Sequence, residues 1–214
     1  MSKGEATRKR IIEIAAPLFN QRGYKGCSLN AIMEATGLEK GGIYRHFESK
    51  EELAAEAFDY AWNATMALRT DGIDKIPDHV DRLKEHISRF VYRSGIPGGC
   101  PLLNTAIDSD DGNPVLRERV RKALRGWQAR LRNILEDGIA KGTVNPEIDP
   151  AEVANHIIAN VEGGVVISRL ERSDVPLRDA RDRLTKYLEL KVRAPQPSEK
   201  PVTTVKALSS STKK

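Results

Sequence analysis

The sequence has little of what several large classes of protein require. It contains two cysteines in 214 residues, too few for the disulfide framework of a small secreted domain. Its apolar runs fall far short of the ~20 residues that a bilayer-spanning helix needs. The N-terminus "MSKGEATRKR" leads directly into an amphipathic pattern and has no apolar centre like that of a secretory signal peptide. These absences predict a cytoplasmic protein that does not enter a membrane.

The motifs of common enzymes and metal sites are missing as well. The four histidines do not have the spacing of an HExxH zinc site, and no glycine-rich phosphate loop, nucleophile elbow or pair of catalytic acids stands out. His79 and His86 share one face of an expected helix, but Arg82 and Leu83 occupy the positions where a third metal ligand would stand. We therefore predict a protein that is not an enzyme and uses no metal ion or cofactor.

What the sequence does have is an uneven distribution of charge. Residues 1–50 contain nine Lys or Arg against five Asp or Glu, a formal charge of +4. Residues 191–214 contain six against one, a charge of +5, which leaves −4 on the middle of a chain whose total is +5. A basic N-terminal segment suits a polyanionic partner. Solvated surface charge explains the same numbers, so charge alone does not decide between the two.

Glycine and proline punctuate a sequence that otherwise shows the apolar spacing of helices, with no alternating strand pattern. Apolar spacing and capping residues predict helices over about 5–22, 29–36, 40–47, from Ser49 through Leu68, 78–94, 101–107, from Asn113 to Gly142, from Asp149 through Val165, and about 176–191. The prediction is an all-α protein with a small N-terminal module (1–50), a larger helical body (51–193) and a disordered tail (194–214) that is rich in Pro, Ser and Lys.

Two short predicted helices, 29–36 and 40–47, fit a helix-turn-helix because only Gly37-Leu38-Glu39 separates them. The turn needs a residue that tolerates positive φ, and Gly37 supplies one. The second helix of such a motif enters the major groove of DNA. The missing side chains of Gly41 and Gly42 would let this helix come close to the bases.

Polar side chains surround those two glycines. Lys40 and Arg45 can reach guanine edges or phosphates. Tyr44 and His46 suit phosphate oxygens, and Lys50 adds charge at the start of the next helix. These residue types in this order point to a surface that contacts duplex DNA.

The apolar residues on the other side of the helix support the same interpretation. Ile43 and Phe47, four residues apart, are expected to pack on Ile11, Leu18 and Ile32. The alternative is a strained glycine loop with solvated charges. The agreement of cap, turn and apolar spacing favours the DNA-binding helix.

Three motifs occur in order within residues 7–60: "FNQRGY", "SLNAIMEATG" and "KGGIYRHFESKEEL". Together they resemble the N-terminal signature of the TetR/AcrR family of bacterial transcriptional regulators. The resemblance implies a three-helix DNA-binding module ahead of a helical ligand-binding and dimerisation domain. It also implies a homodimeric, sequence-specific repressor that a small-molecule effector releases from a palindromic double-stranded DNA operator.

The resemblance implies particular contacts with DNA. It assigns phosphate contacts to Ser28, Tyr44, His46 and Lys50, and base contacts to Lys40, Gly41, Gly42 and Arg45, with Asn30 as a further candidate. Members of the family often carry Ser or Thr at the position of Glu39. A carboxylate there puts the operator sequence in question, and not the binding of DNA.

In such regulators the helices of the body enclose a pocket for the effector, whose identity the sequence does not reveal. The candidates for that pocket are Trp62, Met66, Phe90, Cys100, Leu103, Ile107, Trp127 and Leu131. Ordinary core packing is the alternative for each, because pockets and cores use the same residue types. A helical protein that binds a small molecule without specific DNA binding is a further alternative for the whole chain.

Cys100 raises the possibility of a different signal. It follows two glycines and precedes Pro101 at an expected helix N-terminus, where the partial positive charge lowers the pKa of a thiol. Some regulators of the family with a Gly-Cys pair here resemble electrophile or oxidant sensors. A free cysteine is also commonly a small buried hydrophobic residue, and we favour that inert interpretation.

Pairing of two copies is expected, because a symmetric dimer places two recognition helices in successive major grooves ~34 Å apart. Apolar stripes on the last two predicted helices suit a four-helix bundle between subunits. The predicted interface consists of Val153, Ile157, Val161, Gly164, Val165, Leu184 and Leu188. The alternative is that these stripes pack within one chain.

Overall fold

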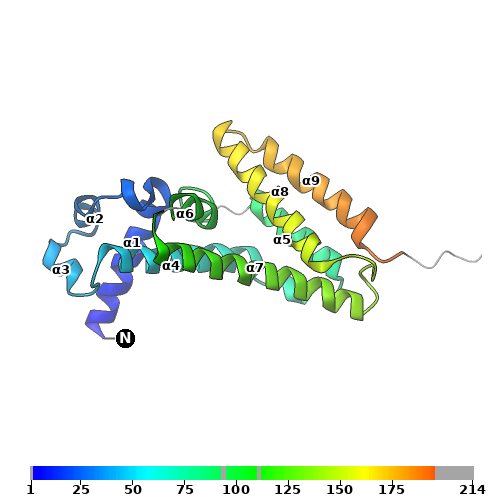
Figure 1. Ribbon diagram of the computed structural model, residues 1–214, viewed down its shortest axis with the longest axis horizontal. Helices are drawn as coiled ribbons and strands as arrows, with labels where there is room; N and C mark the ends of the chain where they lie inside the picture. Colours follow the sequence, from blue (N-terminus) through cyan, green and yellow to red (C-terminus); the bar gives the residue numbers. More distant parts are fainter. Residues whose placement is uncertain (1, 93–94, 110–111, 196–214) are drawn as a thin grey trace, which may run out of the picture.

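A computed structural model describes residues 2–92, 95–109 and 112–195 (Figure 1). The chain forms α1 (Lys3–Gly26), α2 (Leu29–Thr36), α3 (Lys40–Tyr44), α4 (Lys50–Thr70), η1 (Ile73–Lys75), α5 (His79–Tyr92), α6 (Pro101–Ser109), α7 (Pro114–Ala140), α8 (Pro150–Leu170), α9 (Val175–Tyr187) and a π-helical turn η2 (Leu188–Val192). An isolated bridge between Val144 and Arg193 is the only β-type pairing in these ranges. The all-α prediction is confirmed.

Two further findings concern the predicted tail and helices that could span a membrane. The predicted tail lies outside the described residues from residue 196 onward. Across the described ranges, no helix combines the length and the apolar character needed to cross a lipid bilayer.

The predicted capping residues set the ends of the short helices. Ser28 Oγ accepts from the backbone N–H of Ala31 at 3.1 Å, and α2 ends at Gly37, whose φ of 68° lies in the left-handed region. Ser49 Oγ accepts from Glu52 N at 3.0 Å and begins α4. These local signals therefore fix the position of the turn between α2 and α3.

The first helix breaks at Gly23 and not at Pro17. Gly23 has a φ of 72° and a ψ of 169°, while Pro17 lies within the helical part of α1. Helical structure resumes after Gly23 as far as Gly26, and the N–H of Cys27 donates to Gly23 O at 3.0 Å. The helix predicted to end near residue 22 thus ends its first straight part there, and helical structure extends three residues beyond Gly23.

Two hydrophobic cores meet along α4. One face of α4 joins the N-terminal core, which also contains Ile11, Ile32, Ile43 and Phe47, each at most 2% exposed. The adjacent face of α4 joins the core of the body through Phe58 and Trp62. The expected packing of Ile43 and Phe47 on α1 and α2 is confirmed. The predicted domain boundary after residue 50 thus falls at the start of a helix that both cores share.

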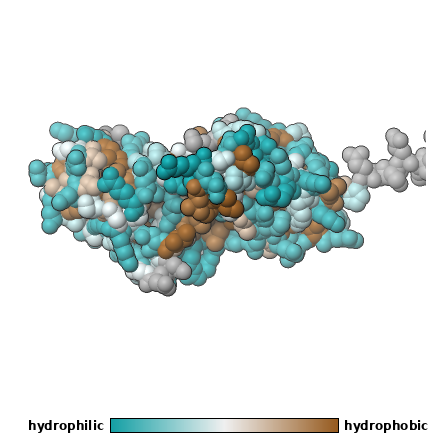
Figure 2. All heavy atoms as spheres, turned by 90° about the horizontal axis from the view of Figure 1, so that it is seen from above, coloured by the Kyte–Doolittle hydropathy of each residue, from teal (hydrophilic) through white to brown (hydrophobic). Residues whose placement is uncertain are grey.

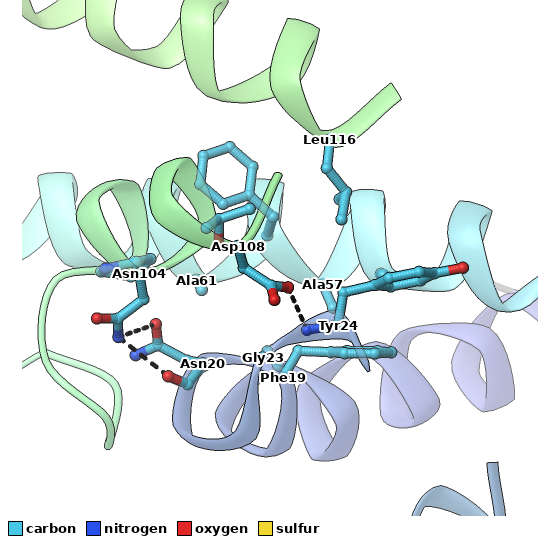
Figure 3. A pocket seen from close by; sticks show the side chains of 14 residues that line it. Phe19, Asn20, Gly23, Tyr24, Ala57, Ala61, Asn104, Asp108 and Leu116 are labelled. Carbon is cyan, nitrogen blue, oxygen red and sulfur yellow. Dashed lines mark hydrogen bonds between the residues drawn. The ribbon is translucent and has the colours of Figure 1, made fainter. Parts of the chain in front are cut away.

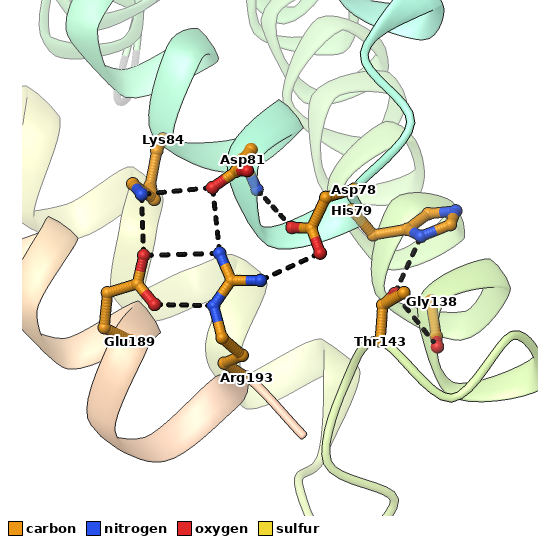
Figure 4. Close-up of polar contacts among 8 residues, drawn as sticks. All are labelled: Asp78, His79, Asp81, Lys84, Gly138, Thr143, Glu189 and Arg193. Atoms are coloured by element: carbon orange, nitrogen blue, oxygen red, sulfur yellow. Dashed lines mark hydrogen bonds and ion pairs between the residues drawn. The ribbon is translucent and has the colours of Figure 1, made fainter. Parts of the chain in front are cut away.

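Arg193 fastens the end of the chain to α5 (Figure 4). Its guanidinium donates to Asp78 Oδ2 and Asp81 Oδ1, both at 2.8 Å, and to Glu189 Oε2 at 2.5 Å. Lys84 Nζ donates to Glu189 Oε1 at 2.6 Å. The hydrogen bonds from Arg193 and Lys84 lower the pKa of Glu189 to about 2. This network holds η2 against the first turn of α5.

The apolar stripes of α8 and α9 lie inside one chain. All seven residues of the predicted interface, Val153, Ile157, Val161, Gly164, Val165, Leu184 and Leu188, are buried in a single copy. The reason is that α8 packs against both α9 and α7, so its stripe faces the core of its own chain. A Cβ at Gly164 would lie 3.0 Å from Ala180 Cβ, which shows how closely the two helices approach. A residue buried in this way offers no surface to a second copy, and this assignment is corrected.

A different apolar group is exposed where α8 meets α9. Ile167, Leu170 and Val175 are 51%, 78% and 51% exposed. Apolar side chains gather near the middle of the face shown in Figure 2, which looks onto the side that carries α8 and α9. Such a group is larger than isolated surface apolar residues and is typical of an interaction site.

Candidate nucleic-acid interface

The short helices α2 and α3 lie at one end of the molecule (Figure 1). The expected second helix is shorter than predicted, because regular structure ends at Tyr44 instead of residue 47. Arg45 and His46 form the turn that leads to α4, with the N–H of Arg45 bonded to Gly41 O at 3.1 Å. The turn keeps both side chains next to the helix, so α3 and this turn form one continuous surface.

The nine candidate DNA contacts are accessible to different degrees. Ser28, Asn30, Lys40, Gly41, Tyr44 and Arg45 are exposed, and Gly42, His46 and Lys50 are half-buried. A Cβ added to Gly41 would meet no atom of the described chain within 4 Å, and one added to Gly42 would be in ordinary contact with Leu38. The fold itself therefore does not require glycine at position 41.

Aromatic rings hold two of the lysines at this surface. Lys40 Nζ lies 5.9 Å from the centre of the Tyr44 ring, and Lys50 Nζ lies 4.4 Å from that of Tyr24. Lys50 Nζ also donates to Tyr24 O at 2.6 Å. An ammonium group has three N–H donors, so Lys50 can donate to a second acceptor without giving up this contact.

Arg8 on α1 supports this surface from behind. It was not among the residues predicted from the sequence. Its guanidinium pairs with Glu52 at 3.0 Å and with Glu56, and its Nε donates to His46 O at 3.2 Å. It also lies 4.6 Å from the centre of the Phe47 ring. The available signal was the pair Glu52 and Glu56, because acids four residues apart form a helix face that needs a cation.

A hydrogen-bonded link joins α1, the first helix of the N-terminal module, to the body (Figure 3). Asn104 Nδ2 on α6 donates to Asn20 O at 3.0 Å, and Asn20 Nδ2 donates to two carbonyls in residues 97–99 at 3.0 and 3.1 Å. Beside it, the N–H of Tyr24 donates to Asp108 Oδ2 at 2.5 Å. Sequence reasoning missed this link, since paired asparagines 84 residues apart leave no local pattern.

The candidate effector residues fall into three groups in the structure. Trp62, Phe90, Cys100, Trp127 and Leu131 are buried, Met66 and Leu103 are partly buried, and Ile107 is exposed. Trp127 stacks on Phe90 at a centroid distance of 5.4 Å and donates its indole N–H to His86 Nε2 at 2.9 Å. Ile107 is 73% exposed because α6 turns that side outward, and its assignment to an interior pocket is corrected.

A hollow of about 530 Å³ opens beside two of these candidates. Phe90 and Cys100 line it, together with Arg69, residues 95–99, Val165, Ser168, Arg169, Arg172, Ser173, Asp174 and Leu177. This volume lies within the range of ~300–1,000 Å³ that is usual for small-molecule sites. The segment 97–99, which Asn20 holds, forms part of the wall.

Cys100 is an unreactive thiol in this setting. It is 1% exposed, and its Sγ donates to Glu162 Oε1 at 2.9 Å. Burial, and next the nearby Glu162 carboxylate, raise the pKa of Cys100 to about 12. The expected lowering by the helix N-terminus is therefore wrong, because desolvation outweighs it. Cys27 is also buried, and burial raises its pKa.

Metal chemistry has no structural support in the described ranges, where no group of three or more His, Cys, Asp or Glu side chains could hold an ion. His79 contacts Asp137 and Thr143 at 2.8 Å each, and His86 accepts from Trp127. Both histidines thus serve as hydrogen-bonding groups within the fold.

Comparisons with known proteins agree with this geometry. Residues 11–57 match the family model "Bacterial regulatory proteins, tetR family", and residues 72–184 match "Tetracyclin repressor-like, C-terminal domain". The HTH-type transcriptional regulator YxaF of Bacillus subtilis (strain 168) is 29% identical over 185 residues, 82% of this chain and 91% of that protein. The HTH-type transcriptional repressor DhaR of Mycobacterium sp. (strain GP1) is 23% identical over 172 residues, 79% and 86% of the two chains.

The arrangement of the helices is also similar to that of a solved structure. The crystal structure of a TetR transcriptional regulator from Chloroflexus aurantiacus J-10-FL has a TM-score of 0.87 and 45% sequence identity, and the match covers 91% of this chain and 100% of that one. Its agreement with the present chain extends over both the N-terminal module and the helical body.

Proposed function

The chain belongs to the TetR family of bacterial transcriptional regulators, and from that premise we propose that it binds a palindromic operator as a homodimer and is released by a small-molecule effector. Residues 1–50 would contact DNA, and residues 51–193 would bind the effector and the second copy. Family membership makes the chain a DNA-binding regulator of the repressor type.

The observation that carries this proposal is the surface of α3. A glycine whose Cβ position is open stands between exposed cations at one end of the molecule. A helix of this kind can approach base edges, while its flanking side chains reach phosphates. We assign base contacts to Lys40, Gly41, Gly42 and Arg45, a further contact to Asn30, and phosphate contacts to Ser28, Tyr44, His46 and Lys50.

Pairing of two copies would use the exposed side of α8 and α9. Ile167, Leu170 and Val175 supply accessible apolar surface there, unlike the buried stripe. Leu170→Glu is expected to convert a dimer to a monomer in sedimentation velocity, because a carboxylate would be desolvated at the interface. Retention of the dimer by this variant would place the interface elsewhere.

Release would begin in the hollow beside Arg69 and Phe90. Arg69 stands in the last turn of α4, and Asn20 connects the wall segment 97–99 to α1. A ligand that shifts either element would move α2 and α3 and lower operator affinity by a coupling free energy of ~1–3 kcal/mol. Signalling through Cys100 is not favoured, because its thiol is buried with a pKa of about 12.

The test is selection of bound genomic fragments by the purified full-length protein at moderate salt, followed by footprinting. We expect a protected site with two inverted half-sites whose centres are ~34 Å apart. Recovery of no fragment above the random background would contradict the DNA-binding proposal. Protection of a single half-site would contradict the dimer.

A further inference from the structure

Four buried polar atoms between α4 and α8 have no hydrogen-bond partner in the part of the chain that the structure describes. They are Thr65 Oγ1, Arg69 Nε, Arg69 Nη1 and Glu162 Oε2. The three side chains are 2%, 6% and 7% exposed. An unpaired buried polar atom destabilises the fold, and more strongly when it is charged. Three such side chains in one place call for a functional explanation.

The donors and the acceptor lie close to one another without pairing. Arg69 and Glu162 attract each other electrostatically, yet no ion pair within 4 Å joins these two described residues. Cys100 lies between them and donates to the other oxygen of Glu162 at 2.9 Å. Thr65 precedes Arg69 by one helical turn and so lies on the same face of α4. The Arg69 guanidinium is held 3.6 Å from the centre of the Phe90 ring, which fixes the direction of its N–H bonds.

The hollow described above gives access to this cluster. Arg69, Phe90 and Cys100 line it. Glu162 and Thr65 each lie next to a lining residue, since Glu162 Oε1 accepts from Cys100 Sγ at 2.9 Å and a Cβ on Gly95 would meet Thr65 Oγ1. Its apolar wall includes Phe90, Val165 and Leu177. A ligand in the hollow would thus contact apolar side chains and the Arg69 guanidinium, next to the other unpaired polar atoms.

The charges of the cluster restrict what can bind. One guanidinium and one carboxyl group oppose each other, and burial shifts the pKa of both toward the neutral form, lowering that of Arg69 and raising that of Glu162. The neighbouring Cys100 thiol and His86 imidazole are neutral, since burial raises the pKa of the first to about 12 and lowers that of the second to about 4. The exposed residues Arg169, Arg172 and Asp174 also line the hollow, where water and salt screen their charges. A charged group on the ligand would leave an uncompensated charge beside this buried cluster, which costs binding free energy.

We propose that the effector is a neutral molecule with an apolar body and a primary carboxamide, or an equivalent adjacent acceptor and donor. Its carbonyl oxygen accepts from Arg69, and its two N–H bonds donate to Glu162 and Thr65. This assignment rests on the proposed function, because it names the chemistry of the molecule that releases the operator.

The test measures binding without DNA, by titration calorimetry on the full-length protein. Four probes of matched shape are compared: 3-phenylpropanamide, 3-phenylpropanoate, 3-phenylpropylamine and propylbenzene. We expect the amide to bind roughly tenfold or more tightly than each of the others, the size of one hydrogen bond to a charged group. Equal affinities, tighter binding of the carboxylate, or no binding of the amide at its solubility limit would overturn the proposal.

Two variants make the assignment specific to these residues. Glu162→Gln removes the negative charge, so the carboxylate should gain roughly tenfold and the preference for the amide should disappear. Thr65→Val keeps the side-chain volume and should weaken the binding of the amide alone. If thermal melting shows that the Glu162→Gln variant is unfolded, Thr65→Val takes its place in the test. Glu147→Gln, on an exposed turn away from the hollow, is the control and should change nothing. An unchanged order of affinities in both site variants would also overturn the proposal.

A separate assay distinguishes this proposal from the proposed function. The amide is added to the protein bound to its selected fragment, and retention of the DNA is measured. If the amide binds with the expected variant pattern but does not release the DNA, the binding site is supported and its role as the effector site is contradicted. If other compounds release the DNA and the amide does not bind, the proposed amide site is contradicted, while the proposal of an effector-controlled repressor still stands.

Discussion

Asn104 on α6 donates its side-chain N–H to the backbone oxygen of Asn20 on α1 at 3.0 Å, and the same amide group donates to Gly98 O at 2.8 Å. Gly98 belongs to the wall of the hollow, and Asn20 lies in the first helix of the N-terminal module. One side chain thus contacts both regions. A displacement of the wall by a ligand has a direct hydrogen-bonded route to α1.

Replacing Asn104 with Ala should therefore uncouple the two regions. We expect a loss of ~1–3 kcal/mol in the free energy of unfolding, measured by urea denaturation, because three carbonyl oxygens (Asn20 O, Asn20 Oδ1 and Gly98 O) lose this donor. The ratio of operator affinities without and with effector should also fall toward one. Asn63→Ala, at an exposed position on α4, is the control for both measurements. A variant with normal stability and a full response would show that the link carries no signal.

Gly41→Ala should separate stability from DNA binding. The added methyl group meets no atom of the described chain, so the variant should be more stable by ~0.5–1 kcal/mol, the usual gain of alanine over glycine in a helix. Operator affinity should fall by roughly tenfold or more, because the methyl group would occupy space assigned to a base. Gly126→Ala on α7 is matched, since its Cβ also meets nothing within 4 Å. It should gain the same stability and bind DNA normally.

Arg45→Ala and Lys50→Ala should differ in the kind of affinity that they lose. Loss of a base contact at Arg45 should cost ~1–3 kcal/mol on the operator and relax the preference at one position. Loss of a phosphate contact at Lys50 should weaken all DNA about equally and reduce the salt slope by about one. Fluorescence anisotropy on operator and random duplexes at several salt concentrations measures both. Wild-type affinities in both variants would contradict the assigned surface.

His86 should make the stability of the protein depend on pH. Burial lowers its pKa from 6.5 to about 4 in the folded state. Between these values the unfolded chain binds a proton that the folded chain does not, so stability is fully present above about pH 6.5 and is lost as the pH falls toward 4. The loss should be about 3 kcal/mol in urea denaturation. His86→Gln keeps a partner for Trp127 and should remove this part of the slope, and an unchanged slope would assign it to other groups.

Cys100 should resist alkylation in the folded protein. Its pKa of about 12 leaves almost no thiolate at pH 8, and it is 1% exposed. Iodoacetamide should modify it slowly in buffer and rapidly in urea, as followed by mass spectrometry. Cys100→Ser should keep any response to oxidants that the wild type shows. Fast native alkylation would restore the interpretation of Cys100 as a sensor.

Local signals made the helix-turn-helix predictable from the sequence. Ser28 and Gly37 begin and end α2 because capping and positive φ depend on single residues. The packing of Ile43 and Phe47 follows from their helical spacing. The helix after the turn was nevertheless predicted three residues too long, since periodicity does not show where a short helix gives way to a turn.

The partner of an apolar surface was not predictable in the same way. Spacing shows that Val153 and Ile157 are buried, but it does not show whether a neighbouring helix or a second copy covers them. The burial of Cys100 depends on Glu162, 62 residues further along the chain. One signal was present: Glu162 interrupts the otherwise apolar stripe of α8, and a carboxylate in such a place needs a purpose.

The helix α4, which both cores share, has the dimensions of a lever arm. Its 21 residues make it about 30 Å long, with Ser49 at one end and Arg69 near the other. A tilt of about 5° at the Arg69 end would carry the Ser49 end about 2.6 Å, by the geometry of a rigid rod of that length. In a symmetric pair the two displacements add to about 5 Å, more than the rise of one base pair, ~3.4 Å. A change too small to disturb the packing around one side chain would thus move the two recognition helices out of register with successive major grooves.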